Sequence, residues 1–399
     1  VLAGGAARGS YEVGVVDYIV NDVARQLGRE VPLDILCGTS VGAINACALA
    51  AFADEPRGRA RRLVEKWTNL RIADLVRVDL MRVFGLVRNL FRATPPTSIA
   101  EPGGARRGGL VDPSGIERLI VDSIPFERIG EHLRSGLLSA VTVSATHVGS
   151  GRTVVFVARD GELPRWTGDP TVSGRLTELR ADHALASAAI PLLFPAVRID
   201  GHFYCDGGLR QNVPLSPARR LGADGLIVVN PRYLPSDPVT VDENEQAFPS
   251  PLFLLGKTLN ALLLDRLESD IDRVNRINAI LNAGTRRYGP HFVDEVNREM
   301  GKPPGQGLKP LKTVLIRASS DIGRLSAELV RSPAFARRAP GMIGRVMRQL
   351  AEGEPRREAD LLSYLLFDGE FCAQLIDLGR SDARARHAEL CAFFEELKA

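Results

Sequence analysis

A Gly-x-Ser-x-Gly turn between an apolar run and a run of small residues constrains this chain more than any other feature. The motif Gly-Thr-Ser-Val-Gly occupies 38–42, an apolar run precedes it, and the small-residue run 43–51 follows. This order predicts a strand, a sharp turn and a helix, the setting that presents a nucleophilic serine. Gly38 and Gly42 allow the tight turn. Ser40 would lie at a helix N-terminus, where free amides favour developing negative charge.

Composition limits the classes of protein that this chain can belong to. Its 399 residues, 45% of them apolar, suffice for one large domain with an addition or for two domains. A formal net charge of +3, with acids and bases interleaved, gives no reason to expect nucleic acid as a partner. The five cysteines show no metal-ligand spacing. We therefore expect no metal site, and a reducing, cytoplasmic compartment.

The start of the chain bears on its targeting. Val1 lies within an apolar stretch that has the pattern of a strand, and no methionine precedes it. We expect that a preceding piece is missing, together with any targeting signal it carried. No apolar run approaches the ~20 residues of a membrane-spanning helix.

Strand patterns alternate with helix patterns along most of the chain. This alternation predicts a mostly parallel sheet covered by helices on both faces. The expected strands are 1–3, 31–37, 137–145, 153–158, 225–230 and 312–316, with a hairpin over 197–205. The expected helices are 11–27, 41–53, 59–67 and 182–190.

The second half of the chain becomes increasingly helical. A long amphipathic helix is expected over 252–281, followed by a polar, Gly/Pro-rich connection over 285–310. From about Ser320 onward the patterns are helical only. We therefore expect one α/β domain over 1–319 and a helical C-terminal extension over 320–399.

The glycine-rich segment 4–9 permits two functional interpretations. It approximates a dinucleotide-binding fingerprint, which requires an acidic residue at the end of the next strand. Asp34 lies at the start of that strand instead. Alternatively, successive amides of the loop converge on an oxygen that becomes negative during acyl transfer, forming an oxyanion hole. The spacing alone is also compatible with a plain strand-to-helix turn.

The segment Asp206-Gly207-Gly208 also permits two interpretations. Asp-Gly is the most frequent two-residue turn signal, so the segment can be a hairpin turn and nothing more. Alternatively, Asp206 is the base that a nucleophilic serine requires. The Ser–Asp–His order of α/β-hydrolases would require His291 or His387 as the base. His291 lies in a Gly/Pro-rich stretch and His387 in a charged terminal helix, so we expect both at the surface.

Together these stretches resemble the patatin-like phospholipases. The segments 4–9, 38–42 and 206–208 occur in the order and at the spacing of that family. The stretch Ala186–Pro195 resembles the family's segment before its catalytic aspartate, and Asn212–Pro214 resembles the segment after it.

The resemblance implies a three-layer α/β patatin-like fold with a mostly parallel central sheet and a helical C-terminal extension. It implies a Ser/Asp dyad, with Ser40 as nucleophile, Asp206 as base and no need for histidine, metal or cofactor. Glycines flank both catalytic residues: Gly38 and Gly42 at the elbow, Gly207 and Gly208 at the dyad turn. The implied oxyanion loop consists of Gly4, Gly5, Ala6, Ala7, Arg8 and Gly9.

Two residues of this implied site require comment. The family usually has glycine where this chain has Ala6, and alanine disfavours positive φ. Arg8 either holds the loop, contacts an anionic head group or is a solvated residue at a helix start.

An exposed carboxylate with a pKa of ~4 is a weak base toward an alcohol. We therefore expect burial among Phe203, Tyr204 and Cys205 to make Asp206 more basic.

A basic amphipathic stretch bears on membrane contact. Leu80, Phe84, Val87 and Phe91 share one helical face in a segment rich in arginine. Such a helix either packs on the sheet with its charges in water or lies at a lipid surface.

The sequence thus predicts an enzyme that hydrolyses acyl esters of phospholipids or lysophospholipids. The alternatives are acyl transfer from the same acyl-enzyme and a catalytically silent lipid-binding protein. The expected partners are the lipid, a peripheral membrane surface and, through the C-terminal helices, a second copy of the chain.

Overall fold

The computed structural model describes most of the chain. It covers residues 1–72, 77–78, 111–164, 166, 170–191, 193–210, 213–234, 267–301, 307–339, 344–345, 347–348, 351 and 359–397. The amphipathic stretch 80–91 and the first part of the helix expected over 252–281 lie outside these residues.

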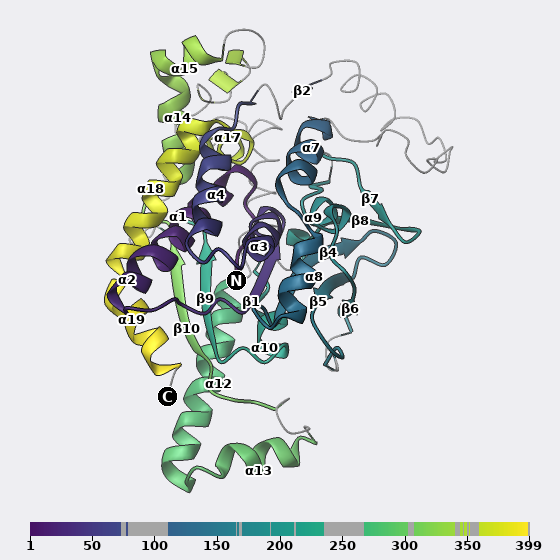
Figure 1. Ribbon diagram of the computed structural model, residues 1–399, viewed down its shortest axis with the longest axis vertical. Coiled ribbons are helices and arrows are strands. Elements are labelled where there is room, and N and C mark those ends of the chain that lie inside the picture. The colour runs from purple at the N-terminus through teal and green to yellow at the C-terminus, as the bar shows by residue number, and fades with distance from the viewer. Residues whose placement is uncertain are drawn as a thin grey trace, which may run out of the picture.

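The main sheet is mixed and contains both parallel and antiparallel pairs of strands (Figure 1). Parallel pairs join β1 to β4, β9 to β10 and β5 to β6, while Leu2 bridges Gly38 and Val229 in parallel and so links β1 to β9. Antiparallel pairs join β4 to β5, β4 to β8 and β7 to β8. The strands are β1 (Ile35–Thr39), β4 (Ala140–His147), β5 (Thr153–Ala158), β6 (Val172–Leu176), β7 (Val197–Ile199), β8 (His202–Asp206), β9 (Gly225–Asn230) and β10 (Lys312–Arg317). A separate pair consists of β2 (Arg77–Val78) and β3 (Val111–Asp112).

Helices cover the sheet in a three-layer α/β arrangement (Figure 1). The first helical segment runs through η1 (Ala6–Arg8), α1 (Gly9–Tyr18), the π-helical turn η2 (Ile19–Val23) and α2 (Ala24–Gln26). Next come α3 (Val41–Ala51), α4 (Gly58–Thr68), α7 (Ser114–Ser123), α8 (Glu127–Arg134), α9 (Ala181–Ser187), η3 (Gly207–Leu209) and α10 (Leu215–Arg220). The remainder are α12 (Leu267–Tyr288), α13 (Phe292–Glu299), α14 (Ile322–Arg331), α15 (Pro333–Arg338), α17 (Ala359–Leu365), α18 (Gly369–Ala385) and α19 (His387–Glu396). Within the described ranges, no helix combines the length and apolar character needed to span a bilayer.

The C-terminal helix α18 packs directly on the N-terminal helix α1, and the two lie side by side in Figure 1. Two glycines allow their backbones to approach. A Cβ on Gly14 would lie 2.0 Å from the Ile376 carbonyl oxygen, and one on Gly379 would lie 2.2 Å from the Tyr11 carbonyl oxygen. The Tyr11 hydroxyl also donates to Asp382 at 2.9 Å. The end of the chain therefore packs against the element that follows the glycine-rich loop.

The region after β9 differs from the expectation. The long helix α12 continues to Tyr288, and α13 occupies part of what was expected to be a polar connection. The two helices pack through stacked rings of Tyr288 and Phe292, whose centroids are 5.7 Å apart. Gly284 leaves room for this contact, because a Cβ there would lie 2.0 Å from the Phe292 ring. The first half of α12 packs on the sheet through Ile271, and α13 with the far end of α12 extends away from it at the bottom of Figure 1.

Candidate active site

Two strand ends meet beside β4 and bring Ser40 next to Asp206. The last residue of β1, Thr39, lies opposite Ser144, and the last residue of β8, Asp206, lies opposite Ala145. Since β1 and β8 pair with neighbouring positions on the same strand, their ends converge despite the long separation in sequence. The Ser40 Oγ donates a hydrogen bond of 2.7 Å to Asp206 Oδ2.

The backbone at Ser40 adopts the strained conformation of a strand-to-helix elbow. Its φ of 55° and ψ of −128° lie in a region that residues with a side chain rarely adopt. The elbow also requires very close backbone contacts. A Cβ on Gly38 would lie 2.2 Å from the Gly42 carbonyl oxygen, and one on Gly42 would lie 2.4 Å from the Leu2 carbonyl oxygen. Both positions therefore need glycine because a larger residue would displace the elbow.

Asp206 is fully buried, and both of its carboxylate oxygens have partners. Oδ2 accepts from Ser40, and Oδ1 accepts from the Gly208 N–H at 2.7 Å. Burial raises the pKa of Asp206 to about 7, although these two hydrogen bonds act in the opposite direction. A carboxylate in this position is a far stronger base than an exposed aspartate.

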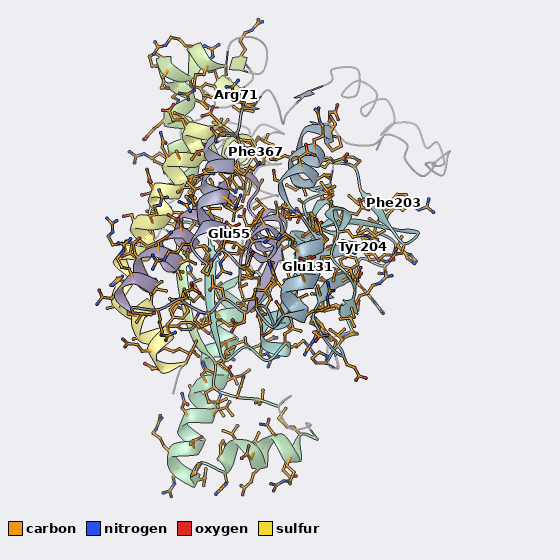
Figure 2. All side chains as sticks on the ribbon, viewed as in Figure 1. Glu55, Arg71, Glu131, Phe203, Tyr204 and Phe367 are labelled. Atoms are coloured by element: carbon orange, nitrogen blue, oxygen red, sulfur yellow. The ribbon has the colours of Figure 1, made fainter. Side chains whose placement is uncertain are left out.

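The neighbours that bury Asp206 differ in part from the expected set. Phe203 is 47% exposed and points away from the sheet, whereas Tyr204 is buried on the opposite face of the same strand (Figure 2). Side chains alternate along a strand, so Phe203 cannot cover Asp206 as expected. The expected direction of the pKa change is correct, but the expected cover by Phe203 is wrong, and Cys205, next to Asp206 in β8, also points to the opposite face of the strand.

Ser187 holds the elbow from α9, a role that the sequence analysis missed. Its Oγ accepts a hydrogen bond of 2.8 Å from the Ser40 N–H and donates one of 2.6 Å to the Ser144 carbonyl oxygen. The Asp206 N–H in turn donates to the Ala189 carbonyl oxygen at 2.9 Å. The stretch after α9 therefore supports both members of the Ser40–Asp206 pair. The sequence feature that could have identified Ser187 is its position as a serine within a run of alanines.

The glycine-rich loop turns directly into η1 beside Ser40. Gly5 precedes this 3₁₀ turn, and the Arg8 N–H donates to the Gly5 carbonyl oxygen at 3.0 Å. Ala6 has a φ of 48°, so alanine occupies the positive-φ position where the family usually has glycine. The first amides of a helical turn have no acceptor within the turn. The loop can therefore direct amides at an anionic oxygen near Ser40.

Arg8 is buried, which excludes a solvated helix-start residue. Its Nε donates to Ser363 Oγ at 2.8 Å, and its guanidinium lies 4.2 Å from the centroid of the Tyr364 ring. Of the three interpretations left open by the sequence, the structure supports the one in which Arg8 holds the loop.

A second buried network joins the loop to the helix after the elbow. Asn45 Nδ2 donates to the Gly9 carbonyl oxygen and to Glu12 Oε2, both at 3.0 Å. Asn45 Oδ1 accepts from Trp67 Nε1 at 3.1 Å. Burial raises the pKa of Glu12 to about 8. The asparagine, a polar residue in an apolar helix, was not identified as important from the sequence.

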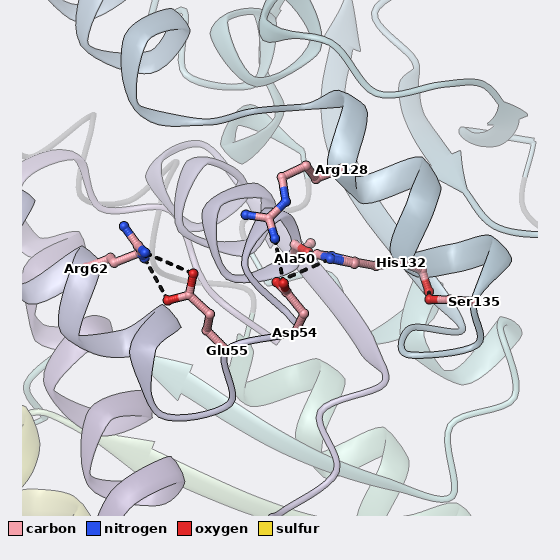
Figure 3. A network of polar contacts seen from close by, with 7 residues as sticks. All are labelled: Ala50, Asp54, Glu55, Arg62, Arg128, His132 and Ser135. Atoms are coloured by element: carbon pink, nitrogen blue, oxygen red, sulfur yellow. Dashed lines mark hydrogen bonds and ion pairs between the residues drawn. The ribbon is translucent and has the colours of Figure 1, made fainter.

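The six histidines all lie among the described residues and have their contacts away from Ser40. His132 and its neighbours anchor the far end of α3 (Figure 3). His132 Nδ1 donates to the Ala50 carbonyl oxygen at 2.8 Å, and Asp54 lies between His132 and Arg128 at 3.3 and 2.6 Å.

The other histidines divide between buried and exposed positions. His183 packs on Phe156 with ring centroids 4.6 Å apart, and burial lowers its pKa to about 4. His387 contacts the Tyr18 hydroxyl. His147 and His202 form an exposed pair, and His291 precedes α13 at the surface.

An apolar cavity of about 200 Å³ opens beside Ser40. Its walls come from α3, α4 and α7, from the segment 188–197 and from Phe367 near the C-terminus. One face of α3 runs along it, presenting Val41, Ile44, Ala48 and Phe52. Eleven residues of helix at 1.5 Å per residue give this wall a length of about 17 Å. Ala6 of the glycine-rich loop lies in the same wall as Ser40.

The described residues of the site do not fit a metal site or a dinucleotide site. Among the described residues, no cluster of three or more His, Cys, Asp or Glu side chains could hold a metal ion. The dinucleotide interpretation requires an acidic residue at the end of β1, where the structure has Thr39 and the Ser40 elbow.

Comparison with known proteins identifies the family. A family model described as patatin-like phospholipase matches residues 1–219, more than half of the chain. This chain belongs to the patatin-like phospholipase family. The matched region includes both Ser40 and Asp206, together with the glycine-rich loop, and ends before the C-terminal helices.

Curated relatives are similar over the same region. A phospholipase of Pseudomonas aeruginosa, named as cGAMP-activated, is 27% identical over 213 residues, covering 53% of each chain. The uncharacterized protein YjjU of Escherichia coli is 26% identical over 239 residues, covering 59% of this chain and 52% of its own. The chain thus spans about half the length of these curated relatives. VipD of Legionella pneumophila, a solved structure, aligns over 94% of this chain and 66% of its own at 14% identity, with a TM-score of 0.26.

Burial of Asp206 predicts a stability change with a defined pH dependence. Between pH 4 and 7, the Asp206 carboxyl ionises in the unfolded chain before it ionises in the folded one, because folding raises its pKa from 3.8 to about 7. Wild-type stability therefore falls across this window relative to Asp206→Asn, which does not titrate. We expect the melting-temperature advantage of Asp206→Asn to grow from pH 4 to 7 and then level off, as measured by calorimetry.

The matched control is Asp200→Asn, at an exposed position paired with Arg175. Its melting-temperature difference from the wild type should change little over the same range. A constant difference for Asp206→Asn would show that the folded-state pKa is not raised.

Proposed function

We propose that this protein hydrolyses carboxylic ester bonds of phospholipids or lysophospholipids through an acyl-enzyme on Ser40, with Asp206 as the base. The observation that carries the proposal is that the Ser40 hydroxyl, in the wall of an apolar cavity, donates a 2.7 Å hydrogen bond to the fully buried carboxylate of Asp206. A serine hydroxyl becomes a useful nucleophile only with such a base in contact.

The first half of the reaction transfers the acyl group to the enzyme. Ser40 Oγ attacks the ester carbonyl carbon while its proton passes to Asp206 Oδ2. When the tetrahedral intermediate collapses, the bond between carbon and the leaving oxygen breaks, and Asp206 gives its proton to that oxygen. The lysophospholipid or glycerophosphoryl alcohol departs, and the acyl chain remains on Ser40.

Water then completes the cycle. Asp206 accepts a proton from a water molecule as its oxygen attacks the acyl carbon. The bond between carbon and Ser40 Oγ breaks, and the serine recovers its proton from Asp206. The free fatty acid leaves. One carboxylate therefore moves the proton in both halves, so its pKa near neutrality suits it to act as base and then as acid.

The oxyanion requires donors that are already in place. The loop Gly4–Gly9 adjoins the cavity through Ala6 and opens a helical turn, and such amides stabilise the charge that develops on the carbonyl oxygen. Loss of one such donor costs a factor of about 10²–10³ in rate in acyl-transfer enzymes. This position beside Ser40 supports the loop as the oxyanion hole.

The cavity supports a lipid as the acyl donor. Its walls are mainly apolar, as expected for a site that buries a hydrocarbon chain. The family description and the phospholipase name of one relative agree with this chemistry.

Removing the nucleophile tests the proposal. Ser40→Ala should lower the release of fatty acid from phospholipid and lysophospholipid vesicles by at least about 10³-fold, because the acyl-enzyme can no longer form. The wild type should also be labelled at Ser40 by a fluorophosphonate, as read by mass spectrometry. Ser326→Ala, which removes another buried serine hydroxyl, should retain the wild-type rate.

Two results would contradict the proposed hydrolase and support one of its alternatives. A wild type that neither releases fatty acid nor reacts with the fluorophosphonate would favour a silent lipid-binding protein. Acyl esters that form in place of fatty acid when an alcohol is added would favour acyl transfer.

The pH dependence of the reaction follows from the state of Asp206. The base form is the ionised one, so kcat/KM should fall below pH ~7 with a slope of one as the carboxyl protonates, given a pKa of about 7. Rates on a soluble ester between pH 4 and 9 would measure this limb. A profile flat down to pH ~4 would contradict the role of burial in making Asp206 basic.

The cavity wall predicts a dependence on acyl-chain length. Ala48 lies about 12 Å along α3 from Ser40, so Ala48→Phe should obstruct the distal part of the cavity. We expect kcat/KM for palmitoyl esters to fall about 10-fold or more and that for butyryl esters to change less than about twofold. The smaller Ala48→Leu should give an intermediate loss. Equal losses on both esters would show that the acyl chain does not lie along α3.

A further inference from the structure

The segment 363–369, which lies beyond the region matched by the family, contacts both the glycine-rich loop and the cavity wall. We propose that this segment positions the active site: Ser363 and Tyr364 hold the loop through Arg8, and Phe367 completes the wall of the acyl cavity. The inference rests on the proposed esterase function, because it assigns a role in that reaction.

The contact with the loop is buried and specific. Arg8, Ser363 and Tyr364 are at most 4% exposed. Arg8 donates to Ser363 Oγ at 2.8 Å and lies over the Tyr364 ring at 4.2 Å. A guanidinium held by a hydrogen bond and a ring face has one favoured position, and withdrawing either partner from a buried arginine is costly.

The loop needs such support because Ala6 is strained. A φ of 48° is unfavourable for a residue with a Cβ, and such a conformation persists only where the surroundings enforce it. Ala6 packs against a small buried cluster of Ile190, Leu193 and Tyr364. Tyr364 therefore belongs to the cluster that packs against the strained residue, and its ring also lies against Arg8, two positions later.

The other end of the segment connects to the cavity wall. The Phe367 ring stacks on Trp67 with centroids 6.3 Å apart and an interplanar angle of 15°. The Gly369 N–H donates to the Leu70 carbonyl oxygen at 2.9 Å. Both aromatic rings line the cavity.

A continuous series of contacts joins both ends of segment 363–369 to the glycine-rich loop. From Phe367 they pass to Trp67, from Trp67 to Asn45 and from Asn45 to the Gly9 carbonyl oxygen. Segment 363–369 thus reaches the glycine-rich loop directly at Arg8 and indirectly at Gly9. The geometry predicts separable effects: Tyr364 acts on the oxyanion loop and so on kcat, while Phe367 acts on the acyl chain and so on KM.

Kinetics of single variants test this division. On a long-chain ester, Tyr364→Leu should lower kcat about 10- to 100-fold and change KM by less than about twofold. This loss of kcat is smaller than the loss expected when an oxyanion donor is removed outright, because the loop is displaced and not deleted. Fluorophosphonate labelling of Ser40 should slow to a similar extent. Tyr364→Phe keeps the ring face under Arg8, so its kcat should stay near the wild-type value. Phe367→Ala should raise KM for long-chain esters and leave kcat and short-chain esters little changed.

A matched variant separates positioning from general destabilisation. Phe335→Leu removes another fully buried ring, in α15, and should lower the melting temperature without lowering kcat. If Tyr364→Leu does not fold, Ser363→Ala is the smaller change and should still lower kcat about threefold or more.

The outcomes distinguish the two proposals. An inactive wild type would contradict the proposed function and, with it, this role for the segment. An active wild type whose Tyr364→Leu or Ser363→Ala variant keeps wild-type kcat would overturn the positioning role alone.

Discussion

The hydrogen bond between Ser40 and Asp206 is the contact on which the rest of the site depends. It forms because β1 and β8 end at neighbouring positions along one edge of β4, opposite Ser144 and Ala145. A shift of one residue in either register would turn one side chain to the other face of the sheet. Ser187 and Thr146, which hydrogen-bond the backbones of Ser40 and Asp206, hold this junction in place.

The site is built at some expense of stability. Ser40 and Ala6 both have positive φ, and Asp206 and Glu12 are carboxyl groups buried away from water, with a raised pKa in each case. Each of these features destabilises the fold relative to an unstrained or apolar alternative. They are sustained by contacts that occur at the same place, including the Gly208 amide on Asp206 and the Asn45 amide on Glu12.

Support for the active site comes from two distant parts of the chain. The family-matched region supplies the elbow, the aspartate and the glycine-rich loop. Helices near the C-terminus then pack along α1 through glycine contacts, and residues just before them reach Arg8 and Trp67. The long helix α12 packs on the sheet through Ile271, which joins a buried cluster with Leu226 and Val228 of β9, while α13 and the far end of α12 extend away from the sheet (Figure 1). The helices after β9 therefore differ in whether they contact the candidate site, a difference that their similar sequence patterns did not reveal.

The sequence alone determined the features that depend on local chemistry. The strand–turn–helix around Ser40 follows from glycine spacing and small residues, and β5 lies at the expected 153–158. The resemblance of three short segments to the patatin-like phospholipases implied the pairing of Ser40 with Asp206. Only the tertiary structure decided which side chains surround that pair. Phe203 proved exposed because of strand alternation, and the contact of Arg8 with Ser363 joins residues 355 positions apart. Periodicity and motifs report on neighbours within a few residues, whereas contacts of this kind depend on how whole elements pack.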